Sequence, residues 1–403
     1  MSKVYKITTI GDIMCEPDLL KQVTKEDGYD FMPVFRPLKS LFDEADYVIG
    51  NLETPLAGEE AGYTASLVSF NTPDDIAKTL KELGMDLVST ANNHTLDRDL
   101  AGNVNTLDAL DRIGLVHTGS YRTPDEKDRI AYFTLGETKI AVIAYTYSTN
   151  EVHKNENGEK TEDGCINRLR PAFGARPLVP KYEILTNTRN YIKELTGHTV
   201  TWEESIRLKR ILGVPVAYAD NNFAAWEYDP CLEKLRKDVE EAKKNADLVF
   251  FLPHTGGQFN TEPGICSEYV AYKSALMGVD VIYAAHSHTT QKFGLMQGVP
   301  CFYSLGNVTM WPHSTYSVRE TLPEYGIAAH AYVQDGKLVK HSFSLFKMVQ
   351  DEGVPLTVVP VDELLGTLTD PNERRQLTEE VGTIYTRITG KPAPAEIQRE
   401  YGL

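Results

Sequence analysis

The chain has 403 residues, of which 41% are hydrophobic and 24% charged, a composition typical of a globular protein that buries its own core. The formal net charge of −16 argues against nucleic acid or an anionic membrane as a partner. No stretch approaches eighteen uninterrupted apolar residues and the N-terminus has no apolar signal segment, so we expect a cytoplasmic protein.

Short apolar runs alternate with helical patterns along the chain. The strand-like runs are 4–10, 46–50, 86–90, 139–145, 247–252 and 279–284. The helical patterns are 35–45, 73–84, 100–114, 233–246 and 267–278. This alternation is typical of a parallel sheet covered by helices. The runs after residue 299 are typical of antiparallel strands, with a hairpin turn at Asp335-Gly336. We therefore predict an α/β fold with an antiparallel portion.

Two segments interrupt this alternation. Residues 150–228 indicate a turn-rich loop followed by a partly helical insert, and residues 168–210 carry nine Lys or Arg against four Glu, a local charge of +5. This basic stretch could form a lid that attracts anions, or simply a solvated helix face. Residues 362–403 indicate a C-terminal helical tail, so we predict one domain over 1–361 followed by that tail.

Polar side chains follow five of the strand-like runs directly. These residues are Asp12, Glu53, Asn93 with His94, His254, and His286 with His288. Because the carboxyl ends of parallel strands meet at one edge of a sheet, we expect these side chains to converge. Carboxylate, amide and imidazole ligands without thiolate suit one or two ions of Mn, Fe or Zn. Such a centre activates water, so the pattern favours a hydrolase.

The order of the motifs GD, NLE, ANNHTLD, HTGG, HSHTTQ and YSLGN resembles the CapA-like family of poly-gamma-glutamate capsule biosynthesis proteins, within the calcineurin-like metallophosphatase superfamily. The resemblance covers about residues 5–310. It implies a metallophosphoesterase-like four-layer αββα sandwich with metal ligands at the strand ends. It assigns Asp12, Glu53 and His288 to one ion, and Glu53, Asn93, His254 and His286 to the other.

The same resemblance implies that His94 is the general acid that protonates the leaving group. Asp97 could orient that imidazole or cap the helix that starts near Asp99. The chain departs from the superfamily pattern at Met14, where a histidine is usual, and Glu16 in the same loop is a candidate supplementary ligand.

Two functions follow from these features. The first is a metal-dependent hydrolase, with manganese among the expected metals, that acts on an anionic small-molecule or oligomeric substrate. The bond that it cleaves would be a phosphoester or a gamma-glutamyl bond. The alternative is a non-catalytic metal- or polyanion-binding module that supports poly-gamma-glutamate or capsule synthesis. The amphipathic pattern of the tail also raises the hypothesis that it mediates oligomerisation.

Overall fold

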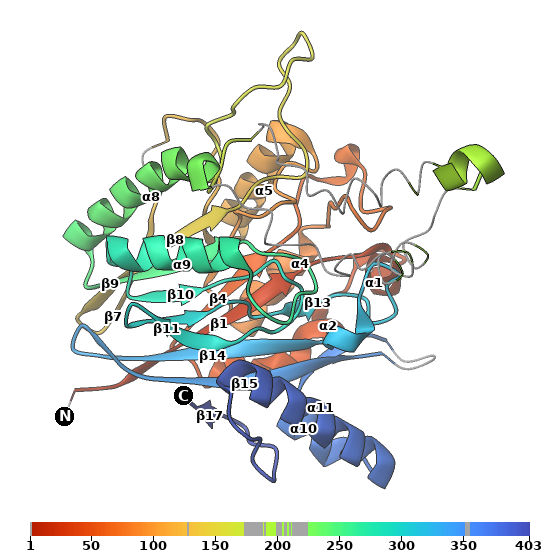
Figure 1. Ribbon diagram of the computed structural model, residues 1–403, viewed down its shortest axis with the longest axis vertical. Coiled ribbons are helices and arrows are strands. Elements are labelled where there is room, and N and C mark those ends of the chain that lie inside the picture. Colours follow the sequence, from red (N-terminus) through yellow and green to blue (C-terminus); the bar gives the residue numbers. More distant parts are fainter. Residues whose placement is uncertain are drawn as a thin grey trace.

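Two β-sheets pack face to face at the centre of the molecule (Figure 1). The computed structural model describes residues 2–126, 129–172, 188, 191–198, 204, 208, 211, 225–350 and 355–403. In this part of the chain the larger sheet has nine strands. Seven follow the order β16 (Thr357–Pro360), β15 (Lys337–Val349), β14 (Tyr325–Gln334), β1 (Tyr5–Ile13), β4 (Tyr47–Leu52), β5 (Leu87–Ser89) and β6 (Val116–Thr118). The other two are β13 (Asn307–Thr309), which pairs with β1, and β17 (Tyr401–Gly402), which pairs with β15.

The smaller central sheet has six strands among the described residues. Their order is β11 (Phe293–Met296), β12 (Val299–Phe302), β10 (Val281–Tyr283), β9 (Leu248–His254), β8 (Thr138–Thr146) and β7 (Ala131–Leu135). A separate short hairpin joins β2 (Thr24–Lys25) to β3 (Gly28–Tyr29).

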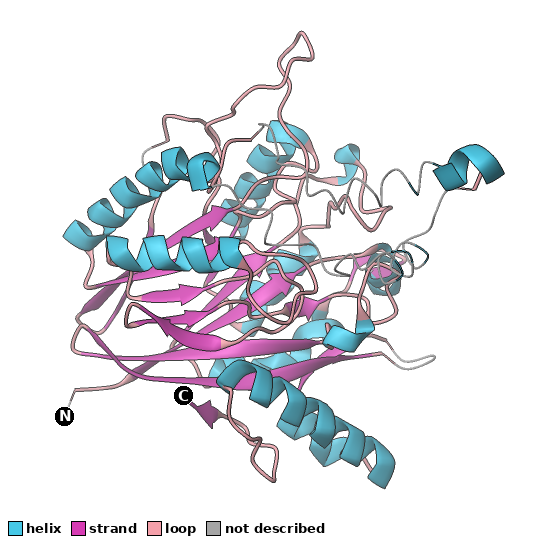
Figure 2. Cartoon of the chain, viewed as in Figure 1, coloured by secondary structure: helices cyan, strands magenta, loops and turns pink. Residues whose placement is uncertain are grey.

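Helices cover the outer face of each sheet (Figure 2). One group packs on the nine-stranded sheet and comprises α1 (Pro17–Val23), α2 (Met32–Phe35), α3 (Lys39–Asp43), α4 (Asp75–Leu83) and α5 (Asp99–Ile113), with the 3-10 turns η1 (Arg36–Leu38) and η2 (Glu59–Ala61) nearby. The other group, α8 (Ala225–Asn245) and α9 (Ile265–Met277), packs on the six-stranded sheet. The layers are therefore helix, sheet, sheet, helix, which confirms the predicted four-layer αββα sandwich.

Strand β8 shows how the sequence produces this layering. Ile140, Val142 and Ala144 face the core between the two sheets. Ala141 and Ile143 face the core beneath α8 and α9. Because successive side chains of a strand point to opposite faces, a continuous apolar run is buried on both sides only when both faces are covered.

The antiparallel portion also agrees with the prediction. Asp335 and Gly336 both have positive φ, 50° and 73°, and join β14 to β15 as a tight hairpin. The C-terminal segment forms α10 (Val361–Thr367) and α11 (Pro371–Thr389), whose apolar side chains extend the core between the sheets. A third 3-10 turn, η3 (Arg319–Thr321), precedes β14.

Most of the predicted insert at 150–228 and of its basic stretch lies outside the described residues. None of the helices in the described part of the chain has the length and apolar character needed to cross a bilayer.

Candidate metal centre

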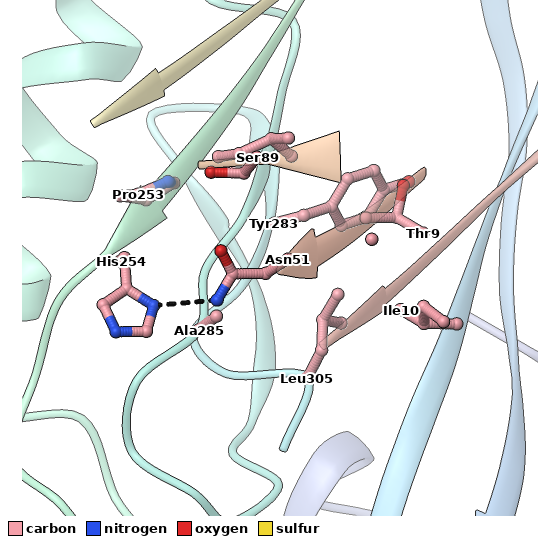
Figure 3. Close-up of a pocket in the computed structure, with 11 residues that line it drawn as sticks. Thr9, Ile10, Asn51, Ser89, Pro253, His254, Tyr283, Ala285 and Leu305 are labelled. Carbon is pink, nitrogen blue, oxygen red and sulfur yellow. Dashed lines mark hydrogen bonds between the residues drawn. The ribbon is translucent and has the colours of Figure 1, made fainter. Parts of the chain in front are cut away.

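Asp12, Glu53 and His254 reach one spot from three strands. Asp12 lies within β1, Glu53 directly follows β4, and His254 ends β9 of the other sheet. The carboxamide of Asn51 bridges Asp12 and His254: its Nδ2 lies 2.7 Å from Asp12 Oδ1 and 3.1 Å from His254 Nδ1. Figure 3 shows the Asn51–His254 hydrogen bond beside a small cavity that both residues line. The cluster therefore lies between the two sheets at their carboxyl edge, where the sequence pattern predicts it.

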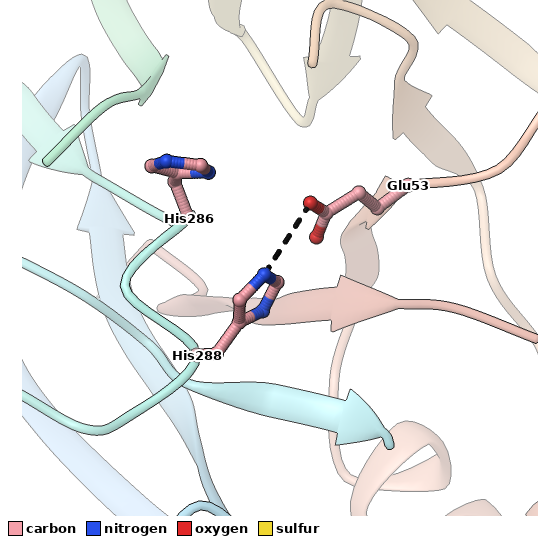
Figure 4. Close-up of side chains that lie close together, drawn as sticks. All are labelled: Glu53, His286 and His288. Atoms are coloured by element: carbon pink, nitrogen blue, oxygen red, sulfur yellow. Dashed lines mark ion pairs between the residues drawn. The ribbon is translucent and has the colours of Figure 1, made fainter. Parts of the chain in front are cut away.

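Glu53 is fully buried, and neither of its carboxylate oxygens accepts a hydrogen bond from the described residues. Its Oε1 lies 3.3 Å from His254 Nε2 and 3.7 Å from His288 Nε2. Figure 4 shows the Glu53 carboxylate turned toward His288, with His286 beside them. A buried carboxylate without donors is costly unless a positive charge compensates it.

His286 and His288 lie on a loop with unusual backbone geometry. Their φ angles are 99° and 53°, in the left-handed region that non-glycine residues seldom adopt. Contacts from both sides hold the loop there. The backbone N–H of His286 donates to Asp12 Oδ2 at 3.0 Å. The Asn307 Nδ2 donates to His288 O, and Asn307 Oδ1 lies 2.9 Å from His288 Nδ1. Such geometry clusters at functional sites, where the surrounding structure imposes it.

Asn93 joins the cluster from the loop after β5. Its Oδ1 lies 2.7 Å from His254 Nε2, and that nitrogen lies 3.1 Å from His286 Nδ1. The turn at Asn93 thus aims an amide oxygen at two of the imidazoles.

Two groups of carboxylate and imidazole atoms could each hold an ion. Among the described residues, one group is Asp12, Glu53 and His254, and the other is Glu53, His286 and His288, with the ligand atoms of each group within 4.8 Å of one another. The family resemblance divides the residues differently: it groups His288, not His254, with Asp12 and Glu53. The 3.4 Å distance from His288 Nδ1 to Asp12 Oδ2 is compatible with that division. Both divisions share Glu53, as a bridging carboxylate requires.

The electrostatics of the cluster suit a cation. Burial and the nearby rings of His254 and His288 lower the pKa of His286 well below its ordinary value. Burial also favours neutral His288, but the carboxylates of Glu53 and Asp12 outweigh it and raise the pKa of His288 to about 9. Burial opposes the ionisation of Asp12, but His288 and His254 hold its pKa below the ordinary value. A cation beside Asp12 would compete with the proton on His288.

His94 and Asp97 form a hydrogen-bonded pair at the edge of this cluster. His94 Nδ1 lies 2.7 Å from Asp97 Oδ2, which also accepts the backbone N–H of Phe70 at 2.6 Å. Arg98, not Asp97, occupies the N-cap position of α5, and the Arg98 side chain makes no capping hydrogen bond. The geometry therefore favours the orienting role of Asp97 over the capping role. Since Asp97 accepts from Nδ1, Nε2 is the ring nitrogen left for proton transfer.

Glu16 is turned away from the cluster. Its two oxygens accept hydrogen bonds from the backbone N–H of Trp311 and the Ser314 hydroxyl, the latter at 2.7 Å. Burial raises the pKa of the Glu16 carboxyl, which favours its neutral form. Met14 is buried in the core beneath the outer helices and offers no nitrogen ligand. Neither residue replaces the missing histidine in this geometry.

Three residues of the site have roles that the sequence pattern did not reveal. Asn51 bridges two of the candidate ligands, Asp12 and His254, and Asn307 holds His288, although both asparagines lie inside motifs noted above, NLE and YSLGN. An isolated asparagine is typical of a turn, so neither role is visible in sequence. The ring of Tyr147 packs on His286 with centroids 4.6 Å apart, and nothing in the sequence indicated it.

The residues present fit a divalent cation. The donor set contains imidazole, carboxylate and amide groups, and its central carboxylate, Glu53, has no hydrogen-bond donor among the described residues. Mixed nitrogen and oxygen ligands of this kind suit Mn, Fe or Zn.

Solved structures with a similar chain path include two bacterial proteins. A hypothetical protein from Thermus thermophilus is 16% identical, with 88% of this chain and 97% of that chain covered and a TM-score of 0.38. A protein from Staphylococcus aureus, named provisionally as a 5′-nucleotidase and solved with alpha-ketoglutarate, is 13% identical, with 94% of this chain and 59% of that chain covered and a TM-score of 0.40.

Two curated relatives are 23–24% identical to this chain over the aligned residues. The PGA biosynthesis protein CapA of Bacillus subtilis is 24% identical over 306 residues, and the capsule biosynthesis protein CapA of Bacillus anthracis is 23% identical over 304 residues. These alignments cover 75% of this chain but only 63% and 58% of those proteins, so the chain spans about three fifths of their length. Residues 6–310 match the family described as bacterial capsule synthesis protein PGA_cap, and the chain belongs to that family.

Proposed function

We propose that the chain is a metal-dependent hydrolase of the CapA-like group, with one or two divalent ions and an anionic substrate. The observation that carries this proposal is Glu53, a fully buried carboxylate that accepts no hydrogen bond from the described part of the chain and lies within 4 Å of two imidazoles. Asp12 and Asn93 add oxygen ligands close by. We expect manganese, iron or zinc to bind there.

A bound ion would act as a Lewis acid that activates water and offsets negative charge on the substrate. The side chains of the protein would bind and position that ion. Its ligands would be Asp12, Glu53, Asn93 and the three histidines. Two of those ligands, His254 and His288, are oriented by Asn51 and Asn307. His94, held by Asp97, is positioned to deliver a proton from Nε2 to a leaving group.

Two features support an anionic substrate. The names of the Bacillus relatives refer to PGA or capsule biosynthesis, and poly-gamma-glutamate is a polyanion. In this chain, the guanidinium carbon of Arg170 lies 5.4 Å from the ring centroid of Tyr147, which itself packs on His286. A cation near the metal ligands would attract a phosphate or a carboxylate. We propose as the bond attacked a phosphoester, which the resemblance to metallophosphatases suggests, or a gamma-glutamyl amide, which the names of the CapA relatives suggest.

A hydrolysis screen tests the proposal. Purified protein loaded with Mn²⁺ is assayed on p-nitrophenyl phosphate, bis(p-nitrophenyl) phosphate and gamma-glutamyl oligomers, with EDTA-treated protein in parallel. We expect metal-dependent turnover of one substrate class, and a loss of roughly 10²- to 10⁴-fold in His94→Ala because general acid catalysis contributes that much. His117→Gln, on the edge strand β6, is the matched control and should retain activity. Equal rates with and without metal would refute the proposal.

A binding module is the second candidate, and Met14 favours it. That residue leaves the first-strand motif without its usual imidazole, and Glu16 does not substitute for it. A chain that binds a single ion and poly-gamma-glutamate but turns over none of the substrates would support this alternative.

A further inference from the structure

The loop that carries His286 and His288 continues into Thr289 and Thr290, which are fully buried. Within the loop, Ser287 Oγ donates to Thr289 O at 2.8 Å. The Thr289 hydroxyl donates to Thr321 O at 2.8 Å, which ties the loop to η3. The positions of the two histidines therefore depend on what fixes these threonines.

A single arginine from the C-terminal helix contacts both threonines. Arg387 lies near the end of α11, and its Nη1 is 3.1 Å from Thr289 Oγ1, 3.2 Å from Thr290 Oγ1 and 2.8 Å from Thr321 O. It also lies 3.4 Å from Thr290 O. Four oxygens from two separate segments thus surround one cationic nitrogen, and charged donors give the stronger protein hydrogen bonds.

This contact is long-range in sequence. Arg387 is about one hundred residues from the loop that it holds, and it lies beyond residues 6–310, the part of the chain that matches the family. Helix α11 is attached to the remainder of the core by Leu377, Val381 and Ile384, so its end is fixed relative to the sheets. Figure 1 shows α11 (dark blue) beside the strand layers, opposite α8 and α9.

We propose that Arg387 is a positioning residue for the metal centre, by which the C-terminal helix sets the geometry of His286 and His288. The inference rests on the proposed function, because it concerns the ligands of the same centre. It also gives the C-terminal segment a role in the site. Both histidines have positive φ, a conformation that persists only while neighbouring contacts enforce it. Releasing Thr289 and Thr290 removes part of that enforcement.

Three variants of the full chain test this role. Arg387→Met keeps the length of the side chain but removes every donor, and Arg387→Lys restores a cationic donor at nearly the same reach. Arg375→Gln is the matched control, because Arg375 lies on the same helix, is 70% exposed and pairs with Glu379. Mn²⁺ affinity is measured by titration calorimetry, and backbone hydrogen exchange is measured for residues 287–291 in the metal-free protein.

We expect Arg387→Met to weaken at least one Mn²⁺ affinity by roughly 10- to 100-fold, the range found when a residue that supports a ligand is removed. Exchange at 287–291 should rise in the same variant, Arg387→Lys should recover part of both losses, and Arg375→Gln should match the wild type. Wild-type affinity and exchange in Arg387→Met would overturn the inference while leaving the proposed function intact. A wild-type chain that binds no Mn²⁺ would refute the proposed function. In that case, faster exchange in Arg387→Met would still support the role of Arg387 in fixing the loop. Unchanged exchange in Arg387→Met would overturn that role.

Discussion

At the scale of single residues, two carboxylates with opposite surroundings make a direct comparison. Glu53 is buried without a donor among the described residues, whereas Glu400 accepts hydrogen bonds from Tyr332, Ser342 and Lys340 and pairs with Lys6. A buried carboxylate that accepts hydrogen bonds from several donors stabilises the fold. A buried carboxylate that has no hydrogen-bond donor destabilises the fold to an extent that a nearby cation reduces.

Substituting each carboxylate by glutamine should therefore have opposite effects. In metal-free protein, Glu53→Gln should leave the melting temperature unchanged or raise it, because it removes a buried carboxylate that has no hydrogen-bond donor among the described residues. Glu400→Gln should lower the free energy of unfolding by about 1–3 kcal/mol, because it breaks charge-assisted hydrogen bonds. Adding Mn²⁺ should raise the melting temperature of Glu400→Gln and not that of Glu53→Gln. Thermal unfolding with and without Mn²⁺ measures both, and an equal Mn²⁺ shift in the two variants would contradict the assignment of Glu53.

The His94–Asp97 pair gives a second prediction at this scale. Asp97→Asn keeps a side chain that can accept the Phe70 N–H but removes the negative charge beside His94. Turnover should fall by roughly 10- to 100-fold, part of the 10²- to 10⁴-fold that general acid catalysis supplies, with Mn²⁺ affinity retained. The measurement is kcat together with Mn²⁺ titration. Loss of metal binding in parallel with activity would instead make Asp97 a determinant of the centre itself.

At the scale of elements, the close approach of two backbones controls the position of Asp12. Gly11 lies in β1, and a Cβ added there would stand only 1.9 Å from the carbonyl oxygen of Gly306. That same oxygen accepts the backbone N–H of Asp12 at 3.0 Å. Glycine is required here by the approach of β1 to the segment before β13, because no side chain fits between them.

Gly11→Ala should consequently separate these segments and move Asp12. We expect the free energy of unfolding to fall by about 1–3 kcal/mol, with weaker Mn²⁺ binding. Gly294→Ala, in β11, is the control, because its added Cβ would be 4.0 Å from the nearest atom and should change stability by less than about 0.5 kcal/mol. Urea unfolding of both variants decides the question, and equal stabilities would contradict the steric explanation.

The elements were more predictable from sequence than their contacts. Runs such as 139–145 and 247–252 are long and apolar, and burial on both faces made them strands. The candidate ligand residues could be singled out because they directly follow such runs, and that they are ligands stays a prediction. The placement of His286 and His288 around Glu53 and Asp12 was not predictable, since it depends on the left-handed backbone of those two histidines. Contacts from Asp12 and Asn307 impose that backbone, and no local pattern encodes it.

At the scale of the whole molecule, two histidines away from the site, the buried His330 and the half-buried His341, link stability to pH. His330 is fully buried between Thr8 and Ser344, and burial lowers the pKa of its imidazole to about 3. Burial likewise lowers the pKa of His341 to about 4. Below about pH 6.5 the unfolded chain takes up protons at these positions that the folded chain does not.

The contribution of these two histidines to stability should therefore be complete above pH 6.5 and decline as the pH falls from 6.5 toward 3, by at most about 1.4 kcal/mol per pH unit for each group. His330→Gln removes one of the two groups and should make the decline between pH 6 and pH 4 shallower. Urea unfolding at pH 7, 6, 5 and 4 for wild type and variant measures the slopes. Parallel curves would show that His330 does not contribute to the decline.

The claim on which the molecule's chemistry depends is that a divalent ion binds at Glu53 between the two sheets. Crystals soaked in Mn²⁺ and measured for anomalous scattering test it most directly. We predict an anomalous peak at about 2.0–2.4 Å from a Glu53 carboxylate oxygen, the usual range for such ligands, with His254 or His288 also coordinating. A fully soaked crystal with no peak at Glu53, or with Mn²⁺ bound only at surface carboxylates, would contradict it.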